Sequence, residues 1–357
     1  MYYVNERLMN LQRIFDQNKR EGYLRLDLNE NPEGLPQEFI DEVLSGVTPE
    51  MVAQYPETLE FTEYLAGRLG TSIERLSLVN GSSEGIRNII EAFTEPGGKI
   101  VCVSPSYAMF EVYSKMYGRD FVPVPYREDL TITVDDVLEY LGDDVQLLIL
   151  VNPNNPMGNA WTKEEMSRFF EEAERRQATV LVDEAYHYFC PETSIGYALT
   201  HEHVFVTRTF SKLFSLAGAR LGYVAGWPEG VALVQKLNTP HNVNMFAMLL
   251  AKAIMEKDGM LESMIESQLA GKRWLVEQLD CAGYEYRSSE GNFMFIKPFG
   301  SASEIVRRMK AEKGILIKEY DGIGAFGNCL RVTTGPKRSM ERFVEALLEI
   351  DGGSINA

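Results

Sequence analysis

The regular alternation of helix-like and strand-like segments between residues 58 and 207 most constrains what this chain can fold into. Its strand-like runs, such as 145–151 (VQLLILV), are apolar throughout, which is typical of strands covered by helices on both faces. We predict helices over 58–69, 83–94, 107–117, 134–141 and 162–177, and strands over 76–79, 99–103, 120–124, 145–151, 179–183 and 203–207. The expected fold class is therefore α/β, with a mostly parallel sheet between helices.

The pattern changes after about residue 239. A long helical stretch over 244–281 precedes short predicted strands, and this order indicates a smaller α+β domain. Its predicted strands are 291–296, 315–318 and 329–333, and its further helices are 301–313 and 338–349. Residues 5–18 have apolar residues at helical spacing and are predicted as an N-terminal helix or arm packed on this domain. We therefore predict a large domain over 50–238, and a second unit made of the arm, 1–49, and the small domain, 239–357.

Charge and composition narrow the classes of partner. The net charge of −17 argues against nucleic acid and acidic membrane surfaces. No apolar run approaches the roughly 18 residues that a membrane helix needs, and the N-terminus lacks a signal-peptide pattern. The four cysteines are widely spaced and include no CxxC pair, which favours reduced thiols over disulfides or zinc. We therefore expect a cytoplasmic protein that acts on small molecules.

Residues 204–223 (VFVTRTFSKLFSLAGARLGY) carry the clearest chemical signal. Lys212 follows Ser211 just beyond a buried strand, and Arg220 lies eight residues further along. Such a lysine is a candidate imine-forming amine, provided that its surroundings lower its pKa. Thr209, Ser211 and Arg220 offer two hydroxyls and a bidentate cation, which suit a phosphate. An aldehyde and a phosphate on one cofactor suggest pyridoxal phosphate, although a serine followed by a lysine is also common on protein surfaces.

Polar residues also follow other predicted strands, at the carboxyl ends where ligands bind in parallel α/β sheets. Small residues that open a helix offer amides to an anion, and an aromatic side chain nearby can stack on a flat ring. Asp183 ends a buried strand, which is costly unless a cation such as a protonated pyridine nitrogen meets it. Each feature also has an ordinary structural interpretation as a helix cap, a core ring or a turn. The residues are Ser82, Ser83, Tyr107, Asn155, Asp183 and Tyr186.

Together with Lys212 and Arg220, these residues occur in an order that resembles the fold-type-I pyridoxal-phosphate aminotransferases, and within them the histidinol-phosphate aminotransferase branch. The resemblance runs from about residue 26 to residue 348. The stretches that carry it are LDLNENPEG (26–34), NGSSEGIRNIIEAFTEPG (80–97), SPSYAMF (104–110), NPNNPMG (152–158), DEAYHYFCP (183–191), TFSKLFSLAGARLGY (209–223), GNF (291–293) and CLRVTTG (329–335). It implies a homodimer that exchanges an amino group between a small amine or amino acid, phosphorylated in this branch, and 2-oxoglutarate.

The resemblance also implies roles for individual residues. Lys212 would bond to the cofactor aldehyde and later move the proton at the substrate carbon, while Asp183 would keep the pyridine nitrogen protonated. Asn155 and Tyr186 would hold the phenolic oxygen, and Tyr107 would stack on the ring. The phosphate would be held by Ser82, Ser83, Thr209, Ser211 and Arg220, the cofactor phosphate of the other subunit would be reached by Tyr55, and the substrate would be bound by Arg331, Lys318 and Asn29.

The chain departs from the histidinol-phosphate branch at three places. Lys318 stands where those enzymes usually carry a second arginine, and a point cation binds a phosphate less specifically than a guanidinium. Residues 5–20 contain no counterpart of the Pro-Tyr pair in the N-terminal arm, and Met157 replaces a threonine. The first two lie in the substrate pocket, so they concern the choice of substrate and leave the cofactor chemistry intact.

Two other functions are compatible with parts of the sequence. A pyridoxal-phosphate decarboxylase of threonine phosphate or serine phosphate type shares the scaffold, but LDLNENP and DEAY resemble the aminotransferases more closely. A non-enzymatic regulator built on this fold is disfavoured by the acidic charge and by the presence of Lys212.

Three further features of the sequence could be mistaken for functional sites. The GxGxxG-like run at 322–327 precedes a predicted strand, whereas a dinucleotide site requires a helix there. His201 and His203 have no third ligand in view, so we expect no metal site. His187 is expected to pack beside the site without titrating.

Overall fold

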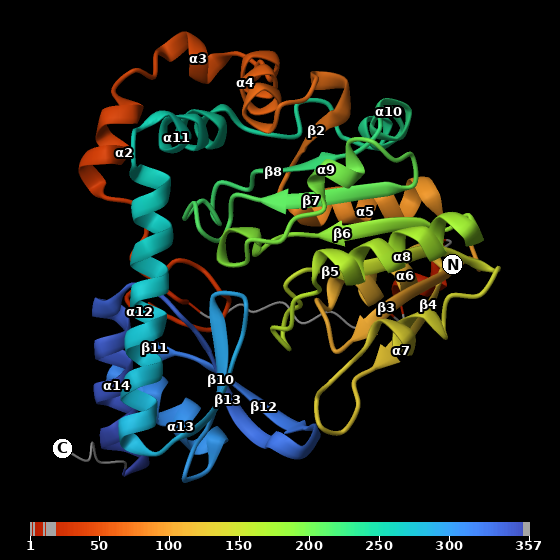
Figure 1. The fold of residues 1–357 in the computed structure, drawn as a ribbon. Helices are drawn as coiled ribbons and strands as arrows, with labels where there is room; N and C mark the ends of the chain where they lie inside the picture. The colour runs from red at the N-terminus through yellow and green to blue at the C-terminus, as the bar shows by residue number, and fades with distance from the viewer. Residues whose placement is uncertain (1, 3, 10, 12–18, 353–357) are drawn as a thin grey trace.

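The computed structural model describes residues 2, 4–9, 11 and 19–352 and arranges them in two lobes (Figure 1). Within these residues the strands form a seven-stranded sheet, a four-stranded sheet and a two-stranded pair. We call the lobe built on the seven-stranded sheet the large domain and the lobe built on the four-stranded sheet the small domain. The seven-stranded sheet has the order β2-β8-β7-β6-β5-β3-β4. Its strands are β2 (Leu76–Val79), β3 (Lys99–Ser104), β4 (Asp120–Pro125), β5 (Val145–Val151), β6 (Thr179–Asp183), β7 (Val204–Thr209) and β8 (Gly222–Ala225).

The large sheet confirms the predicted fold class. Neighbouring strands from β7 to β4 pair in parallel, in the order β7-β6-β5-β3-β4. Only β8 runs against its neighbours, and it pairs antiparallel with both β2 and β7. This short strand was not predicted, because its four residues end a segment that is otherwise loop.

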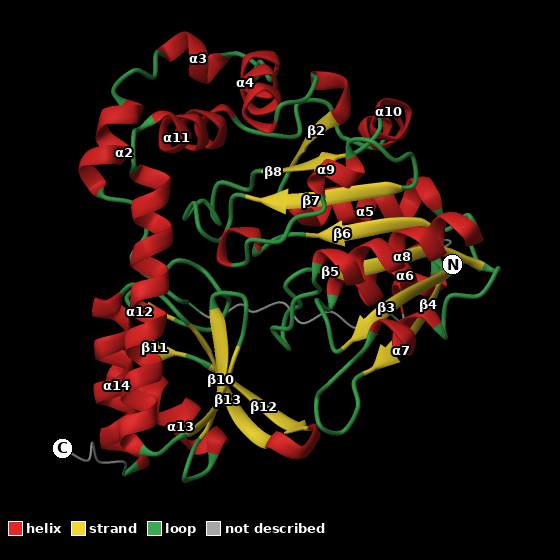
Figure 2. Ribbon diagram, viewed as in Figure 1, coloured by secondary structure: helices red, strands yellow, loops and turns green. Residues whose placement is uncertain are grey.

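Helices cover both faces of the large sheet (Figure 2). Leu148, Val180 and Val206 face one core with α7 and α8, whereas Leu147, Leu181 and Phe205 face another with α5, α6 and α10. Because successive strand residues point to opposite faces, a strand buried on both sides is apolar at every position. The helices of this domain are α4 (Leu59–Leu69), α5 (Ser82–Phe93), α6 (Met109–Tyr117), α7 (Val134–Leu138), α8 (Lys163–Arg176), α9 (Ile195–Ala198) and α10 (Pro228–Lys236), with short 3-10 turns at Ile73–Arg75 and His187–Phe189.

The small domain places helices on one side of its antiparallel sheet (Figure 2). The strand order is β12-β13-β10-β9. The predicted helical stretch 244–281 is two helices, since Gly259 adopts a left-handed φ of 70° between them. The elements are β9 (Glu285–Ser288), β10 (Phe293–Lys297), β12 (Lys318–Ile323), β13 (Gly327–Thr333), α12 (Met260–Ala282), α13 (Ala302–Arg308), α14 (Lys337–Asp351), a π-helical turn at Met309–Lys313 and a 3-10 turn at Gly324–Phe326. The helix α11 (Met245–Glu256) lies instead in the lobe of the large sheet. The helix α11 packs with α2 (Gln37–Leu44) and α4, and α3 (Pro49–Ala53) precedes α4.

The N-terminal segment contacts both domains. Its first helix, α1 (Glu6–Met9), lies against α6, with Arg7 beside Gly118. Further along, β1 (Leu24–Arg25) pairs in parallel with β11 (Ile315–Leu316) of the small domain. The predicted helix over 5–18 falls largely on positions outside the described residues. The domain boundaries at residues 50 and 238 stay a prediction. Among the residues that the structure describes, no helix is long and apolar enough to cross a membrane.

Candidate active site

A cavity of about 470 Å³ lies between the carboxyl ends of the parallel strands and the small domain. Residues from the loops after β2, β3, β5, β6 and β7 line one side, and residues of the N-terminal segment and of β12 and β13 line the other. The structure therefore brings together almost all of the predicted site residues. They are Asn29, Ser82, Ser83, Tyr107, Asn155, Asp183, Tyr186, Thr209, Ser211, Lys212, Arg220, Lys318 and Arg331.

Lys212 has the environment that an imine-forming amine needs. It follows β7, and its Nζ donates a hydrogen bond to the carbonyl oxygen of Leu28 at 3.0 Å. Burial, and secondly the positive charge of Arg331, lower the pKa of Lys212 to about 8. A useful fraction of the amine is therefore unprotonated near neutral pH, which makes it a nucleophile and a base.

Asp183 is a buried carboxyl at the end of β6, with 4% of its surface exposed. Its hydrogen bonds come from neutral donors, Thr207 Oγ1 at 3.3 Å and the Ala185 amide at 3.2 Å. Burial raises the pKa of Asp183 to about 7, although Lys212 acts in the opposite direction. A cationic group in the cavity would stabilise the ionised form, so the position suits the protonated nitrogen of a pyridine ring.

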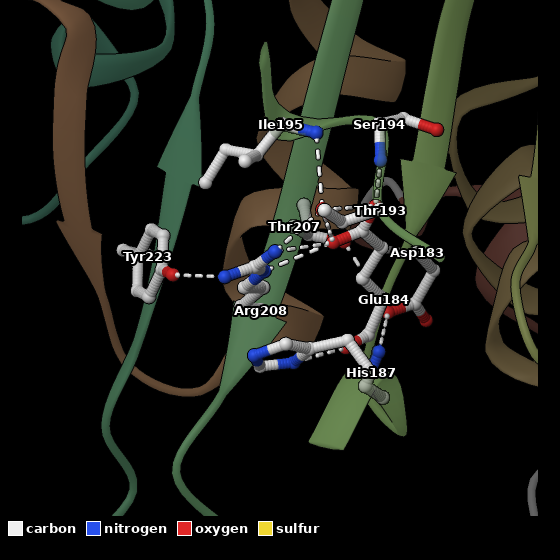
Figure 3. Close-up of polar contacts among 10 residues, drawn as sticks. Asp183, Glu184, His187, Thr193, Ser194, Ile195, Thr207, Arg208 and Tyr223 are labelled. Atoms are coloured by element: carbon white, nitrogen blue, oxygen red, sulfur yellow. Dashed lines mark hydrogen bonds and ion pairs between the residues drawn. The ribbon is translucent and has the colours of Figure 1, made fainter. Parts of the chain in front are cut away.

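Behind Asp183 lies a buried ion pair that sequence reasoning missed (Figure 3). Glu184 has no exposed surface, and its Oε2 accepts hydrogen bonds from Arg208 Nε at 2.9 Å and Nη2 at 2.8 Å. Asp183 pairs with Thr207 in the β6–β7 register, so the next residues, Glu184 and Arg208, meet on the other face. His187 Nδ1 lies 3.2 Å from the Glu184 carbonyl oxygen, and burial lowers the pKa of His187 well below its usual value. The ion pair thus joins the two strand ends that carry Asp183 and Lys212.

The start of α5 and Arg220 form a cradle for an anion. Gly81 has a left-handed φ of 71°, and a Cβ built there would lie 2.2 Å from Arg220 Nη2, so only glycine admits the guanidinium. The helix begins at Ser82 with no side chain capping its first amides. Arg220 Nη1 donates to Ser211 Oγ at 3.2 Å, and Thr209 Oγ1 donates to the same oxygen at 2.9 Å. Free helix amides, hydroxyls and a guanidinium together suit a phosphate.

The three asparagines of the NPNNPMG turn have different partners. Asn152 exchanges hydrogen bonds with the backbone of Trp161, and Asn154 accepts a hydrogen bond from Ser106 Oγ at 2.9 Å. Asn152 and Asn154 therefore stabilise the turn. Asn155 lines the cavity instead, and its Oδ1 accepts a hydrogen bond from Arg331 Nη1 at 3.1 Å. Across the cavity, Ser83 Oγ lies 3.0 Å from the hydroxyl of Tyr107.

Arg331 is the principal cation on the small-domain side. Its Nη2 donates to the carbonyl oxygen of Asp27 at 2.7 Å, and its Nη1 also lies 3.4 Å from the hydroxyl of Tyr320. The buried Nε of Arg331 has no hydrogen-bond partner in the structure. Lys318 is the direct neighbour of Arg331 in the β12–β13 register. The guanidinium and the Lys318 ammonium give this wall of the cavity a positive charge that would attract an anionic group.

Among the cavity residues that were not predicted, Tyr320 and Glu30 have signals in the sequence. Tyr320 lies two positions after Lys318 on β12, and the period of two along a strand places it on the same face. Glu30 belongs to the LDLNENPEG stretch and also lines the cavity. Asn29 in the same stretch has a φ of 58° and donates from Nδ2 to the hydroxyl of Tyr186 at 2.9 Å.

Comparison with known proteins identifies the family to which the chain belongs. The family described as aminotransferase class I and II matches residues 21–347. The chain belongs to that family. A histidinol-phosphate aminotransferase of Caldanaerobacter subterraneus subsp. tengcongensis is 31% identical over 330 residues, covering 91% of this chain and 92% of that protein. One of Chlorobium phaeovibrioides is 30% identical over 359 residues, covering 99% and 98%.

Solved structures of aminotransferases share the fold. The histidinol-phosphate aminotransferase of Clostridium acetobutylicum has a TM-score of 0.81 and 25% identity, covering 92% of this chain and 99% of that one. The enzyme of Sinorhizobium meliloti in complex with pyridoxal-5'-phosphate has a TM-score of 0.83 and 24% identity, covering 92% and 90%. From the family match and these relatives, the present chain is a pyridoxal-phosphate-dependent aminotransferase, whose substrates are an amino donor and a 2-oxo acid.

The cavity of this aminotransferase fits its cofactor. The cradle around Gly81 admits a phosphate, and the buried Asp183 lies where a cationic ring nitrogen would relieve its desolvation. When bound, pyridoxal phosphate supplies an aldehyde that takes up an amine and a ring that accepts the electron pair of the substrate carbon. Lys212, in the wall of the same cavity, carries the amine.

Other predicted features of the aminotransferase lie outside this cavity. Tyr55 is 76% exposed and stacks on His241 with ring centroids 4.3 Å apart, so the structure does not bring it to the site of its own chain. The GxGxxG-like run forms the turn between β12 and β13 and is followed by a strand, as expected. His201 stacks on Tyr197, and His203 Nε2 lies 3.1 Å from the Phe170 carbonyl oxygen.

Proposed function

We propose that this aminotransferase transfers the amino group of a small phosphorylated amine or amino acid, of the histidinol-phosphate kind, to 2-oxoglutarate. The observation that carries the proposal is the pairing of Arg331 with Lys318 on neighbouring strands at the cavity wall. Two cations side by side suit a doubly charged phosphate better than a single carboxylate. The names of the relatives that cover most of this chain point to the same class of substrate.

The geometry supports a role for each of the predicted residues. Lys212 Nζ, with its lowered pKa, would take the proton from the substrate carbon and return it. Asp183 would hold the ring nitrogen of the cofactor, and Asn155 and Tyr186 would hold its phenolic oxygen. Tyr107 would lie on the ring. The phosphate would be bound by Ser82, Ser83, Thr209, Ser211 and Arg220, and the substrate by Arg331, Lys318 and Asn29.

A homodimer is part of this proposal. Tyr55 borders a surface groove lined by Met51, Met245 and Leu249, and its exposed ring is available to a second copy of the chain. In that arrangement Tyr55 would reach the cofactor phosphate of the other subunit. The cytoplasmic location stays a prediction.

The test is a set of amino donors assayed with 2-oxoglutarate, with glutamate as the measured product. The kcat/KM for histidinol phosphate is expected to be about a hundredfold higher than that for histidinol, which lacks the phosphate. A difference of this size is expected when the loss of one charged group leaves its partner in the site unpaired. Lys318→Ala should shrink that ratio, and Lys318→Arg should keep it. Equal rates for both donors would refute the phosphate assignment. Release of carbon dioxide from threonine phosphate or serine phosphate, without glutamate formation, would establish the decarboxylase alternative instead.

A further inference from the structure

Beside the active-site cavity, the loop after β4 meets the turn between β12 and β13. The apolar side chains at this contact form a cluster that we call the joint, and each is at most 8% exposed. The joint consists of Leu130, Met157, Phe295, Ile323, Phe326 and Cys329. It therefore joins the large domain to the small domain and includes Ile323 and Phe326 of the GxGxxG-like run and Met157 of the NPNNPMG turn.

The backbone at the joint is shaped for close contact. The Ala325 amide donates to the carbonyl oxygen of Glu128 at 2.9 Å. Gly324 has a φ of 44°, and a Cβ built there would lie 2.6 Å from both the Glu128 oxygen and Leu130 Cδ2. Leu130 itself has a φ of 65°, which is rare for a bulky residue and costs about 1–3 kcal/mol unless the surroundings impose it. Gly324 of the GxGxxG-like run thus permits a close approach between the two domains.

The large-domain side of the joint is held in place. Within the loop, the Leu130 amide donates to the Arg127 carbonyl oxygen at 2.9 Å, and the Arg127 amide donates to that of Thr131 at 3.0 Å. Arg127 Nη2 contacts Asp136 Oδ1 at 2.7 Å, and Asp136 also completes a capping box with Thr133 at the start of α7. These contacts fix the loop after β4, against which the turn between β12 and β13 packs.

The joint connects directly to the substrate side of the cavity. Tyr320 packs on it, with its ring edge-on to Phe295 at a centroid distance of 5.4 Å, and its hydroxyl lies 3.4 Å from Arg331 Nη1. On the other side, Met157 is two residues after Asn155, whose Oδ1 accepts a hydrogen bond from the same Arg331 atom at 3.1 Å. Of the three groups that contact the Arg331 guanidinium, Tyr320 therefore packs on the joint and Asn155 lies two residues from its member Met157.

We propose that the joint positions β12 against the NPNNPMG turn and thereby sets the affinity for the anionic substrate, without contacting substrate or cofactor. The inference rests on the proposed function only for the choice of substrate in the assay. Because binding depends on the placement of charged groups to within about 1 Å, a loosened joint should weaken substrate binding. Since the cofactor cradle lies on the loops after β2 and β7, cofactor affinity should remain.

The test compares Phe326→Ala and Met157→Thr with the control Met166→Thr. Met166 is a similarly buried methionine of the large domain, but it lies in the core under α8, away from the joint. Rapid mixing of each holoenzyme with glutamate, followed by the absorbance change of the bound cofactor, gives an apparent Kd and a limiting rate. We expect both joint variants to raise the apparent Kd about tenfold, with the limiting rate and the pyridoxal-phosphate Kd changed by less than about twofold. The control should leave all three unchanged within about twofold.

Hydrogen–deuterium exchange provides a readout that does not depend on the substrate. The amides of β12 should exchange faster in both joint variants, while those of β9 should exchange as in the parent and as in the control. An unchanged apparent Kd, or unchanged exchange in β12, would overturn the inference. A parent protein that does not respond to glutamate would instead count against the proposed function, and the exchange comparison would still decide the positioning role of the joint.

Discussion

Replacing Asp183 with asparagine should stabilise the cofactor-free protein, and the gain should grow with pH. Burial raises the pKa of Asp183 from 3.8 to about 7. The folded state therefore holds this proton more tightly than the unfolded state does, so the contribution of Asp183 to stability is fully present below about pH 4 and is lost as the pH rises through about 7. The difference of about 3 pKa units corresponds to about 4 kcal/mol at pH 8, and more than half of it develops between pH 5 and pH 8. Asparagine cannot ionise, so the variant should not show this loss.

The assay is urea unfolding of both proteins after removal of pyridoxal phosphate, at several pH values between about 5 and 8. The quantity of interest is the difference in unfolding free energy between variant and parent, because Lys212 and all other titrating groups are common to both. Both hydrogen bonds to Asp183 end on Oδ1, an acceptor that asparagine keeps, so any offset from changed hydrogen bonding should be constant with pH. A difference that stays constant across this pH range would refute the argument that Asp183 is costly to ionise in its buried position.

Three further predictions concern other parts of the site. Lys212→Ala should abolish turnover and the visible absorbance of the lysine-bound cofactor in a spectrum of the purified protein, and normal activity would remove this residue from the chemistry. Gly81→Ala should weaken the binding of pyridoxal phosphate in equilibrium titrations more than that of pyridoxal, which has no phosphate; an equal loss for both ligands would contradict the cradle. Glu184→Ala should lower the unfolding free energy by about 3–5 kcal/mol because it leaves Arg208 buried and unpaired, while the double variant Glu184→Met/Arg208→Met should recover most of that loss in chemical denaturation. A double variant as unstable as the single one would show that charge is not the cause.

Much of the large domain could be predicted because its physical pattern is local. A strand such as β5, covered on both faces, is apolar at every position, and helices with caps such as Thr162 separate the strands. The cavity residues that directly follow these strands were predictable for the same reason, since parallel strands bring their carboxyl ends to one edge. The short strand β8 and the break before α12 escaped prediction because each depends on a few residues whose local preference is weak.

The residues that sequence reasoning missed depend on pairings between distant segments. Glu184 and Arg208 meet only because β6 and β7 pair in one particular register, and a shift by one residue would separate them. Tyr320 acquires a role through Arg331 on the neighbouring strand. The joint similarly brings Leu130 and Phe326 into one cluster, and no spacing in the sequence predicts that they meet. Register and domain packing are properties of the whole chain, which local patterns do not specify.

The way the N-terminal segment closes the cavity has a consequence for the synthesis of this protein. The Asn29 amide donates a hydrogen bond to Oγ1 of Thr333, 304 positions later, and the Leu26 carbonyl oxygen accepts one from the Thr333 amide on the strand β13. As the chain leaves the ribosome, the large sheet can therefore assemble first, while residues 24–29 wait for the last strand to emerge. A nascent chain stalled before β13 would carry Lys212 and Asp183 and yet lack a finished substrate wall, so competence should arise only at the very end of translation.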